Sequence, residues 1–113
     1  DQLKPAFEKF DVILAPATPV AAFPHDHSNF MSRKLTCSNG LKVSYLCMLR
    51  WIALATACRL PATTIPAGLT ATGLPVGVQL IGPKLADTRM IAIAEAIEER
   101  LGGFQAPPAP DGL

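Results

Sequence analysis

The sequence predicts an α/β fold, in which helices cover a β-sheet. Residues 60–83 read as two short apolar strands joined by a glycine-rich turn, and residues 76–81 alternate with the period of two that is typical of a strand. The continuously apolar run 12–15 is typical of an interior strand that is covered on both faces. Apolar residues fill 45–59 on nearly every side and recur with helical spacing over 87–101, which indicates two helices.

The hairpin over residues 60–83, with its turn over 68–73, is expected to lie inside a larger sheet. Its prolines fall at the ends of the apolar runs, where a missing N–H costs little. Gly73, Gly77 and Gly82 lie in or beside the second strand and give up packing area and chain entropy there. We therefore expect another backbone to lie close against these glycines.

Weaker patterns precede this hairpin. Apolar residues at positions 3, 6, 7 and 10 form one stripe of a short helix, and prolines make residues 17–30 a loop. Residues 33–43 predict a second hairpin, because Asn39-Gly40 accepts the positive φ angles of a tight turn. The second hairpin has few apolar residues, so we expect it to lie outside the core.

Two longer helices are predicted in the rest of the chain. Ser44 can cap the helix over residues 45–59, and a following proline sets its end near Arg59. Because this helix is apolar on nearly every side, we expect it to be buried. Asp87 is expected to cap the last helix, which a pair of glycines at 102–103 ends. Its inward stripe consists of Met90, Ile93, Ala94, Ile97 and Leu101.

The composition excludes several classes of protein. Of the 113 residues 50% are hydrophobic and 17% charged, which excludes a disordered chain. Ten basic and nine acidic residues give a net charge of +1, too balanced for a surface that binds nucleic acid. The most apolar run, residues 45–60, contains two arginines and is shorter than the roughly 20 residues of a membrane span. We therefore expect neither nucleic acid nor membrane as a partner.

The cysteines bear on the cellular compartment of the protein, and the first residue bears on whether the sequence is a piece of a longer one. Its three cysteines show no C-x-x-C spacing and are interpreted as reduced, buried thiols, which favours a cytoplasmic protein. The sequence begins with Asp1 and not with Met, which favours a piece of a longer protein. We expect residues 1–104 to form an incomplete segment of a domain and residues 105–113 to form a proline-rich tail.

The residues themselves offer no catalytic centre. The lysines and serines show no arrangement that would activate a nucleophile, and neither G-x-S-x-G nor G-x-G-x-x-G occurs. His25 and His27 would share one face of an extended chain, but no Cys, Glu or third His lies near them in the sequence to complete a site. We interpret this cluster as a solvated loop, and we predict no catalytic residue, no metal and no cofactor in this chain.

Several separated motifs together resemble the C-terminal part of the amidase-signature hydrolases. They are DVILAPATP at 11–19, Tyr45 followed by WIALA at 51–55, LPA at 60–62 with IPAG at 65–68, and GLPVGVQ at 73–79. The resemblance implies a mixed, largely parallel sheet with flanking helices and the hydrolysis of carboxylic amides. It also implies a serine nucleophile, a second serine on a cis peptide and a lysine base, all in the N-terminal half of the family's enzymes.

None of those three catalytic residues is in this sequence. The resemblance therefore predicts that the chain alone is inactive, and that its partners are the N-terminal part of the same amidase and a small amide substrate. By the same resemblance, four residues are candidates for lining the substrate pocket: Thr18, Tyr45, Met48 and Trp51. For Met48 and Trp51 a plain role in the core is an equal alternative.

Three further residues concern local packing. Relatives often have Asn where Thr56 stands and Gly where Arg59 stands, so the resemblance leaves open how closely the pocket follows theirs. The guanidinium of Arg59 can complement the helix dipole and bond the last carbonyls. Gln79 is interpreted as structural, with its side chain bonded to backbone inside the sheet.

Three functions are compatible with these observations. The chain is the C-terminal segment of an amidase, a stand-alone α/β binding or interaction module, or a small metal-dependent hydrolase built around His25 and His27. Strands missing from the sheet would leave an apolar face open, which predicts a possible homodimer.

Overall fold

The computed structural model describes residues 3–107 and has an α/β architecture. In chain order the elements are the helix α1 (Lys4–Phe7), the strand β1 (Ile13–Pro16), the 3-10 helix η1 (Phe30–Ser32), the strands β2 (Lys34–Thr36) and β3 (Lys42–Ser44), the 3-10 helix η2 (Tyr45–Met48), the helix α2 (Leu49–Cys58), the strands β4 (Ala62–Leu69) and β5 (Pro75–Ile81), and the helix α3 (Asp87–Leu101). The predicted fold class, with a sheet flanked by helices, is confirmed.

The main sheet has three strands in the order β1-β5-β4. The predicted hairpin is β4 and β5, but β4 continues beyond Pro66, through an irregularity between Pro66 and Gly68, to Leu69. Gly68 has φ +125°, a conformation that glycine adopts without strain. Both strand pairs are antiparallel, so within residues 3–107 the sheet contains no parallel pair of the kind that the resemblance implied.

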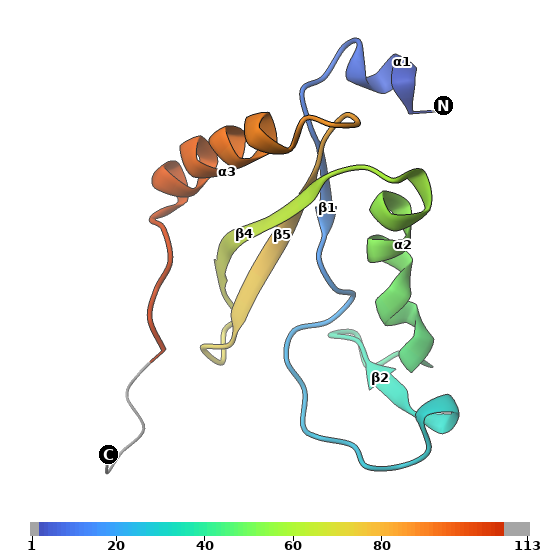
Figure 1. Ribbon diagram of the computed structural model, residues 1–113. Helices are drawn as coiled ribbons and strands as arrows, with labels where there is room; N and C mark the ends of the chain where they lie inside the picture. Colours follow the sequence, from blue (N-terminus) through green and yellow to red (C-terminus); the bar gives the residue numbers. More distant parts are fainter. Residues whose placement is uncertain (1–2, 108–113) are drawn as a thin grey trace.

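The two long helices cover opposite faces of this sheet (Figure 1). Leu80 and Ile81 are both 0% exposed, and because neighbouring strand residues point to opposite faces they belong to different clusters. Leu80 packs with Met90 and Ala94 of α3. Ile81 packs with Ala15 of β1 and Ala55 of α2. The core is therefore two thin layers, one on each side of β5.

The prediction of an interior first strand is wrong for the described part of the chain. The strand β1 lies at the edge of the sheet and pairs with β5 alone. Its residue Leu14 shares a face with Leu80 but is 61% exposed. The reason is that α3 lies over β4 and β5 and leaves this face of β1 uncovered.

The helix predicted to be buried is exposed on most of its surface. Ser44 does cap the segment, as its side chain accepts a hydrogen bond from the backbone N–H of Leu46, but the first turn is the 3-10 helix η2. In α2 only Ala55 is buried, whereas Leu49 is 52% and Ile52 44% exposed. One face of α2 meets the sheet, and nothing among residues 3–107 covers the other.

The end of α2 falls at Arg59, as predicted, in a left-handed conformation with φ +53°. Backbone groups close this end: the N–H of Arg59 donates to Thr56 O and the N–H of Leu60 to Ala55 O, at 3.3 and 3.0 Å. A position of this kind favours glycine, because the Cβ of other residues crowds the following carbonyl.

Side chains and backbone both approach the glycines of the hairpin. A Cβ on Gly82 would lie 2.1 Å from Sδ and 2.5 Å from Cγ of Met90, and a Cβ on Gly77 would lie 2.7 Å from Cγ2 of Thr64. Backbone lies close to both: the carbonyl oxygen of Ile65 would be 3.4 Å from the same Cβ on Gly77, and the N–H of Gly82 donates to Pro61 O at 3.0 Å. Among residues 3–107 a Cβ on Gly73 would meet nothing within 4 Å, so the expected close approach is wrong for that glycine.

The last helix is close to its prediction. Met90 and Ala94 are buried, with Ile93 and Ile97 packed against their cluster, but Leu101 is 55% exposed because it lies in the last turn beside an open hollow. Asp87 is the first helical residue and makes no capping hydrogen bond, so its carboxylate acts through the helix dipole instead. Two glycines with positive φ end the helix, as predicted.

The second hairpin forms a separate two-stranded sheet, β2 with β3, and Gly40 in its turn has φ +80°. Its position apart from the main sheet agrees with the prediction, although Leu35 is only 2% exposed. The thiols predicted to be buried are not: Cys37 and Cys47 are half-buried and Cys58 is exposed, all three free.

No helix between residues 3 and 107 is long and apolar enough to cross a membrane. Most of the tail predicted over 105–113 lies outside the described residues.

Candidate functional site

Two hollows meet at the loop that follows β1. Thr18 lines one of about 500 Å³, together with β1 and the start of β5. Tyr45 lines the other, of about 770 Å³, together with the loop and β2. The residues that line both are Pro19, Val20, Ala21, Ala22 and Val76. The structure therefore brings two of the four predicted pocket residues to adjoining hollows.

Tyr45 is held at its hollow by an aromatic cluster. Its ring meets Phe23 and Phe30 edge to face, with centroids 6.1 and 5.3 Å apart. The guanidinium of Arg33 lies over the same ring, 5.7 Å from its centroid, and the Nε of Arg33 donates to Ser28 O at 3.0 Å. Contacts of these kinds are favourable beyond the area they bury, so the cluster fixes the Tyr45 ring between loop and hairpin.

Thr18 shapes the loop by a local hydrogen bond. Its Oγ1 donates to the backbone carbonyl of Val20 across 2.7 Å. A hydrogen bond between residues two apart in the sequence stabilises a turn. The apolar residues that follow Thr18 in this turn line both hollows.

Met48 and Trp51 line neither of these two hollows. Met48 is half-buried where η2 passes into α2, and Trp51 is 39% exposed, so Trp51 is not a core residue either. The Nε2 of Gln79, which is 6% exposed, donates to the carbonyl of Trp51 at 3.3 Å. Gln79 thus has the structural role that the sequence suggested, but it bonds the backbone of α2 and not that of the sheet.

Three of the residues that line the larger hollow carry ionisable side chains: His25, Asp26 and Lys34. The Oδ1 of Asp26 accepts the backbone N–H of Ser28 at 2.8 Å. The side chain and then the backbone of Ser28, aided by the nearby charges of Arg33 and His27, lower the pKa of the Asp26 carboxyl below its ordinary value of 3.8. At neutral pH the lining of this hollow therefore includes an ionised carboxylate, beside a lysine.

The two imidazoles of the loop lie near each other, with ring centroids 6.2 Å apart, and both residues are exposed. Within the described part of the chain no group of three or more His, Cys, Asp or Glu side chains is placed to hold a metal ion.

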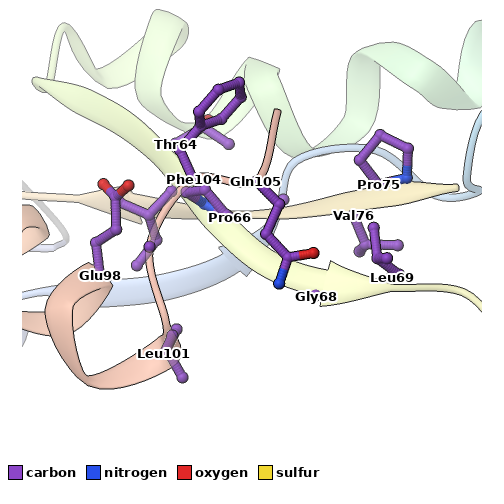
Figure 2. A pocket seen from close by; sticks show the side chains of 13 residues that line it. Thr64, Pro66, Gly68, Leu69, Pro75, Val76, Glu98, Leu101, Phe104 and Gln105 are labelled. Atoms are coloured by element: carbon purple, nitrogen blue, oxygen red, sulfur yellow. The ribbon is translucent and has the colours of Figure 1, made fainter. Parts of the chain in front are cut away.

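A third hollow, of about 440 Å³, lies between the β4–β5 hairpin and the end of α3. Figure 2 shows its wall, in which Leu69, Pro75 and Val76 of the hairpin stand across from Leu101 and Phe104, with Glu98 at one side. None of the four predicted pocket residues lines it. Val76 lines all three hollows and is thus the residue where they meet.

Comparison with known proteins agrees with the motifs in the sequence. A family model described as Amidase matches residues 1–91, and the chain therefore belongs to the amidase family. The A subunit of glutamyl-tRNA(Gln) amidotransferase from Zymomonas mobilis is 36% identical over 103 residues, covering 91% of this chain and 19% of that protein. Fatty acid amide hydrolase of Oryza sativa subsp. indica is 39% identical over 94 residues, covering 83% of this chain and 15% of that protein.

A solved structure shows the same arrangement of elements. The crystal structure of the A subunit of glutamyl-tRNA(Gln) amidotransferase from Thermotoga maritima superposes with a TM-score of 0.73 and 32% identity, over 97% of this chain and 23% of that one. The resemblance to the amidase-signature enzymes is thus confirmed. The chain spans about a fifth of the length of the curated relatives it matches.

Sequence reasoning missed four residues that build the larger hollow or hold Tyr45: Phe23, Phe30, Arg33 and Lys34. Phe23 lies in a loop and Phe30 begins the short 3-10 helix η1, and neither belongs to a periodic pattern in the sequence, so nothing in the pattern indicated that they would meet Tyr45. The hairpin offered one signal, because two adjacent basic residues, Arg33 before its first strand and Lys34 at the start of it, follow a proline-rich loop.

Proposed function

We propose that this chain is the C-terminal segment of an amide hydrolase, in which it lines the pocket for the substrate. The observation that carries the proposal is the family match over residues 1–91, together with the meeting of Thr18 and Tyr45 at adjoining hollows. One relative, the fatty acid amide hydrolase of rice, is named for the hydrolysis of an amide.

The reactive groups of such an enzyme belong to polypeptide outside this sequence. By resemblance, a serine attacks the amide carbonyl while a second serine on a cis peptide takes its proton with the help of a lysine, and backbone amides stabilise the oxyanion. This chain would supply walls and support, with Tyr45 and Thr18 as the pocket residues that the geometry favours and Met48 and Trp51 further from the substrate. Its partners would be the N-terminal part of the amidase and a small amide, and the chain alone would be inactive.

The exposed face of α2 supports a segment of a larger enzyme over a stand-alone binding module. Leu49 and Ile52 are about half exposed, and a free module would gain from burying them. The three free cysteines support a cytoplasmic location, since oxidising compartments favour paired ones.

The proposal is tested with the longest reading frame that contains this sequence. We expect the encoded protein to release ammonia from simple amides and Tyr45→Leu to raise KM more than it lowers kcat, because Tyr45 contacts the bound substrate and not the reacting atoms. Met48→Ala is the matched control, since Met48 lies on the same 3-10 helix and lines neither hollow. Absence of amide hydrolysis, or equal changes in KM for both variants, would contradict the proposal.

A further inference from the structure

Arg33 contacts Tyr45 with both its side chain and its backbone. Its guanidinium carbon lies 5.7 Å from the centroid of the Tyr45 ring, and its carbonyl oxygen accepts the N–H of Tyr45 at 3.1 Å. Because the hairpin ends with Lys34 paired to Ser44, this backbone bond places Arg33 and Tyr45 opposite each other one step further along. Side chains at opposite positions of an antiparallel pair lie close enough to touch, so the hairpin itself brings the guanidinium to the ring.

The far end of the Arg33 side chain is fixed to another segment. Its Nε donates to the carbonyl oxygen of Ser28 at 3.0 Å, in the loop before η1. Ser28 in turn donates its backbone N–H to Oδ1 of Asp26 at 2.8 Å, and the charge of Arg33 favours the ionised form of that carboxylate. A guanidinium is planar, so a hydrogen bond at Nε sets the orientation of the whole group over the ring.

Two phenylalanines complete the surroundings of the Tyr45 ring. Phe23 and Phe30 meet it edge to face, with centroids 6.1 and 5.3 Å from that of Tyr45. Contacts between aromatic rings tolerate a range of centroid distances and angles, whereas a hydrogen bond is directional. The two phenylalanines therefore enclose the ring, and Arg33 is the residue that ties it to a fixed point of the loop.

We propose that Arg33 is a positioning residue of the pocket, which holds the Tyr45 ring in the orientation in which Tyr45 contacts the substrate. The consequence for turnover rests on the proposed function, since it concerns the same pocket wall. The inference goes further by assigning a role to a residue outside the four that the sequence indicated, and by requiring that this residue be arginine. Lysine carries the same charge but has neither the planar group nor the Nε–H, so it cannot replace both contacts.

A spectroscopic test follows the ring of Tyr45 without any reaction. The protein of the longest reading frame that contains this sequence is isotope-labelled in its tyrosine rings, and the Tyr45 signal in NMR spectra is the one that Tyr45→Leu removes. We expect Arg33→Lys to shift this signal, because the ring loses the guanidinium above it. Arg50→Lys, the same change at an exposed position of α2, is the control and should leave the signal in place. Methyl signals of the buried Leu80 and Ile81 should be unchanged in every variant, which shows that the core is intact.

Kinetics with phenylacetamide then test whether Arg33 acts through Tyr45. We expect Arg33→Lys to raise KM about two- to fivefold, the factor that corresponds to a cation–π contact at an exposed site, with little change in kcat. In the Tyr45→Leu background the same change should have no further effect on KM, because the ring that Arg33 holds is gone. Arg50→Lys should leave both constants unchanged.

The outcomes are distinct. A shifted Tyr45 signal together with a rise in KM that disappears in the Tyr45→Leu background would support the inference. An unchanged Tyr45 signal or an unchanged KM in Arg33→Lys, an equal shift in Arg50→Lys, or a rise in KM that persists in the Tyr45→Leu background would overturn it. If the protein releases no ammonia from amides, the proposed function fails, and the Tyr45 signal still decides whether Arg33 holds the ring.

Discussion

The Nε2 of Gln79 donates to the main-chain carbonyl of Trp51 across 3.3 Å and so joins the central strand to α2. Apart from this bond, α2 packs on the sheet through the small cluster of Ala15, Ala55 and Ile81, against which the half-buried Leu54 of the same helix also packs. The helix that carries the exposed apolar face is therefore held by few contacts, and the position of η2 and Tyr45 before it depends on them.

Gln79→Met keeps the volume of the buried side chain and removes the hydrogen bond. We expect it to destabilise the chain by about 1 kcal/mol, the usual net contribution of such a bond. The loss should be concentrated in α2, where hydrogen exchange of the backbone amides should become faster than in α3. Gln105→Met, at an exposed position, is the control and should change neither quantity. Equal acceleration in both helices would contradict a local role for Gln79.

Gly82 leaves room for the side chain of Met90, which is 1% exposed. Gly82→Ala should destabilise the chain by about 1–3 kcal/mol, because its Cβ would overlap both Sδ and Cγ of Met90. Urea unfolding of Met90→Ala and of the double variant completes a cycle, and the double variant should be less destabilised than the sum of the two. Met48→Ala combined with Gly82→Ala is the control pair, in which the losses of unfolding free energy of the two single variants should add. Additivity in both pairs would show that Gly82 and Met90 do not compete for space.

Local patterns in the sequence predicted the elements that local chemistry determines. The positive φ values at Gly40 and Gly102 follow from the turn and the helix end that these residues form, and Met90 and Ala94 face the sheet as their spacing requires. The family was also recognisable, because its motifs are separated and occur in order.

Burial was not predictable from the same patterns. The apolar run at β1 and the apolar surface of α2 predicted full coverage, but coverage depends on what lies beside an element, and Leu14 and Ile52 are exposed among the described residues. The aromatic contacts of Tyr45 were equally unpredictable, since Phe23 lies in a loop, Phe30 lies in the short 3-10 helix η1, and no period in the sequence describes either segment. The candidate site was therefore indicated by resemblance at Thr18 and Tyr45, and its remaining walls came from the structure.

The exposed apolar face of α2 predicts self-association of the isolated chain. Ile52→Glu places a charge on this face at a position that is 44% exposed, so it should weaken association with little effect on folding. Light scattering over a range of concentrations measures the change. Ala57→Glu adds the same charge at another exposed position of α2 and should weaken association less. A monodisperse monomer for the unsubstituted chain at high concentration would contradict the prediction.

The loop beside Tyr45 should respond to acid through Asp26. Its carboxyl pKa is lowered in the folded chain, so its interactions with Ser28 stabilise the loop above the ordinary pKa of 3.8 and are lost as the pH falls through the folded value. Ser28→Ala removes the side chain that contributes most and should raise the pKa of Asp26 toward 3.8. An NMR titration of the Asp26 side chain measures both values, with Ser38→Ala as the control. An unchanged pKa in Ser28→Ala would contradict this cause.

The central claim is that this chain forms part of the wall of a reaction centre whose reactive groups lie elsewhere. Ammonia release from phenylacetamide by the purified 113-residue chain tests this claim most directly. We predict a rate equal to that of buffer at every concentration of the chain. Ammonia release that rises in proportion to the chain and follows it through every purification step would contradict the claim.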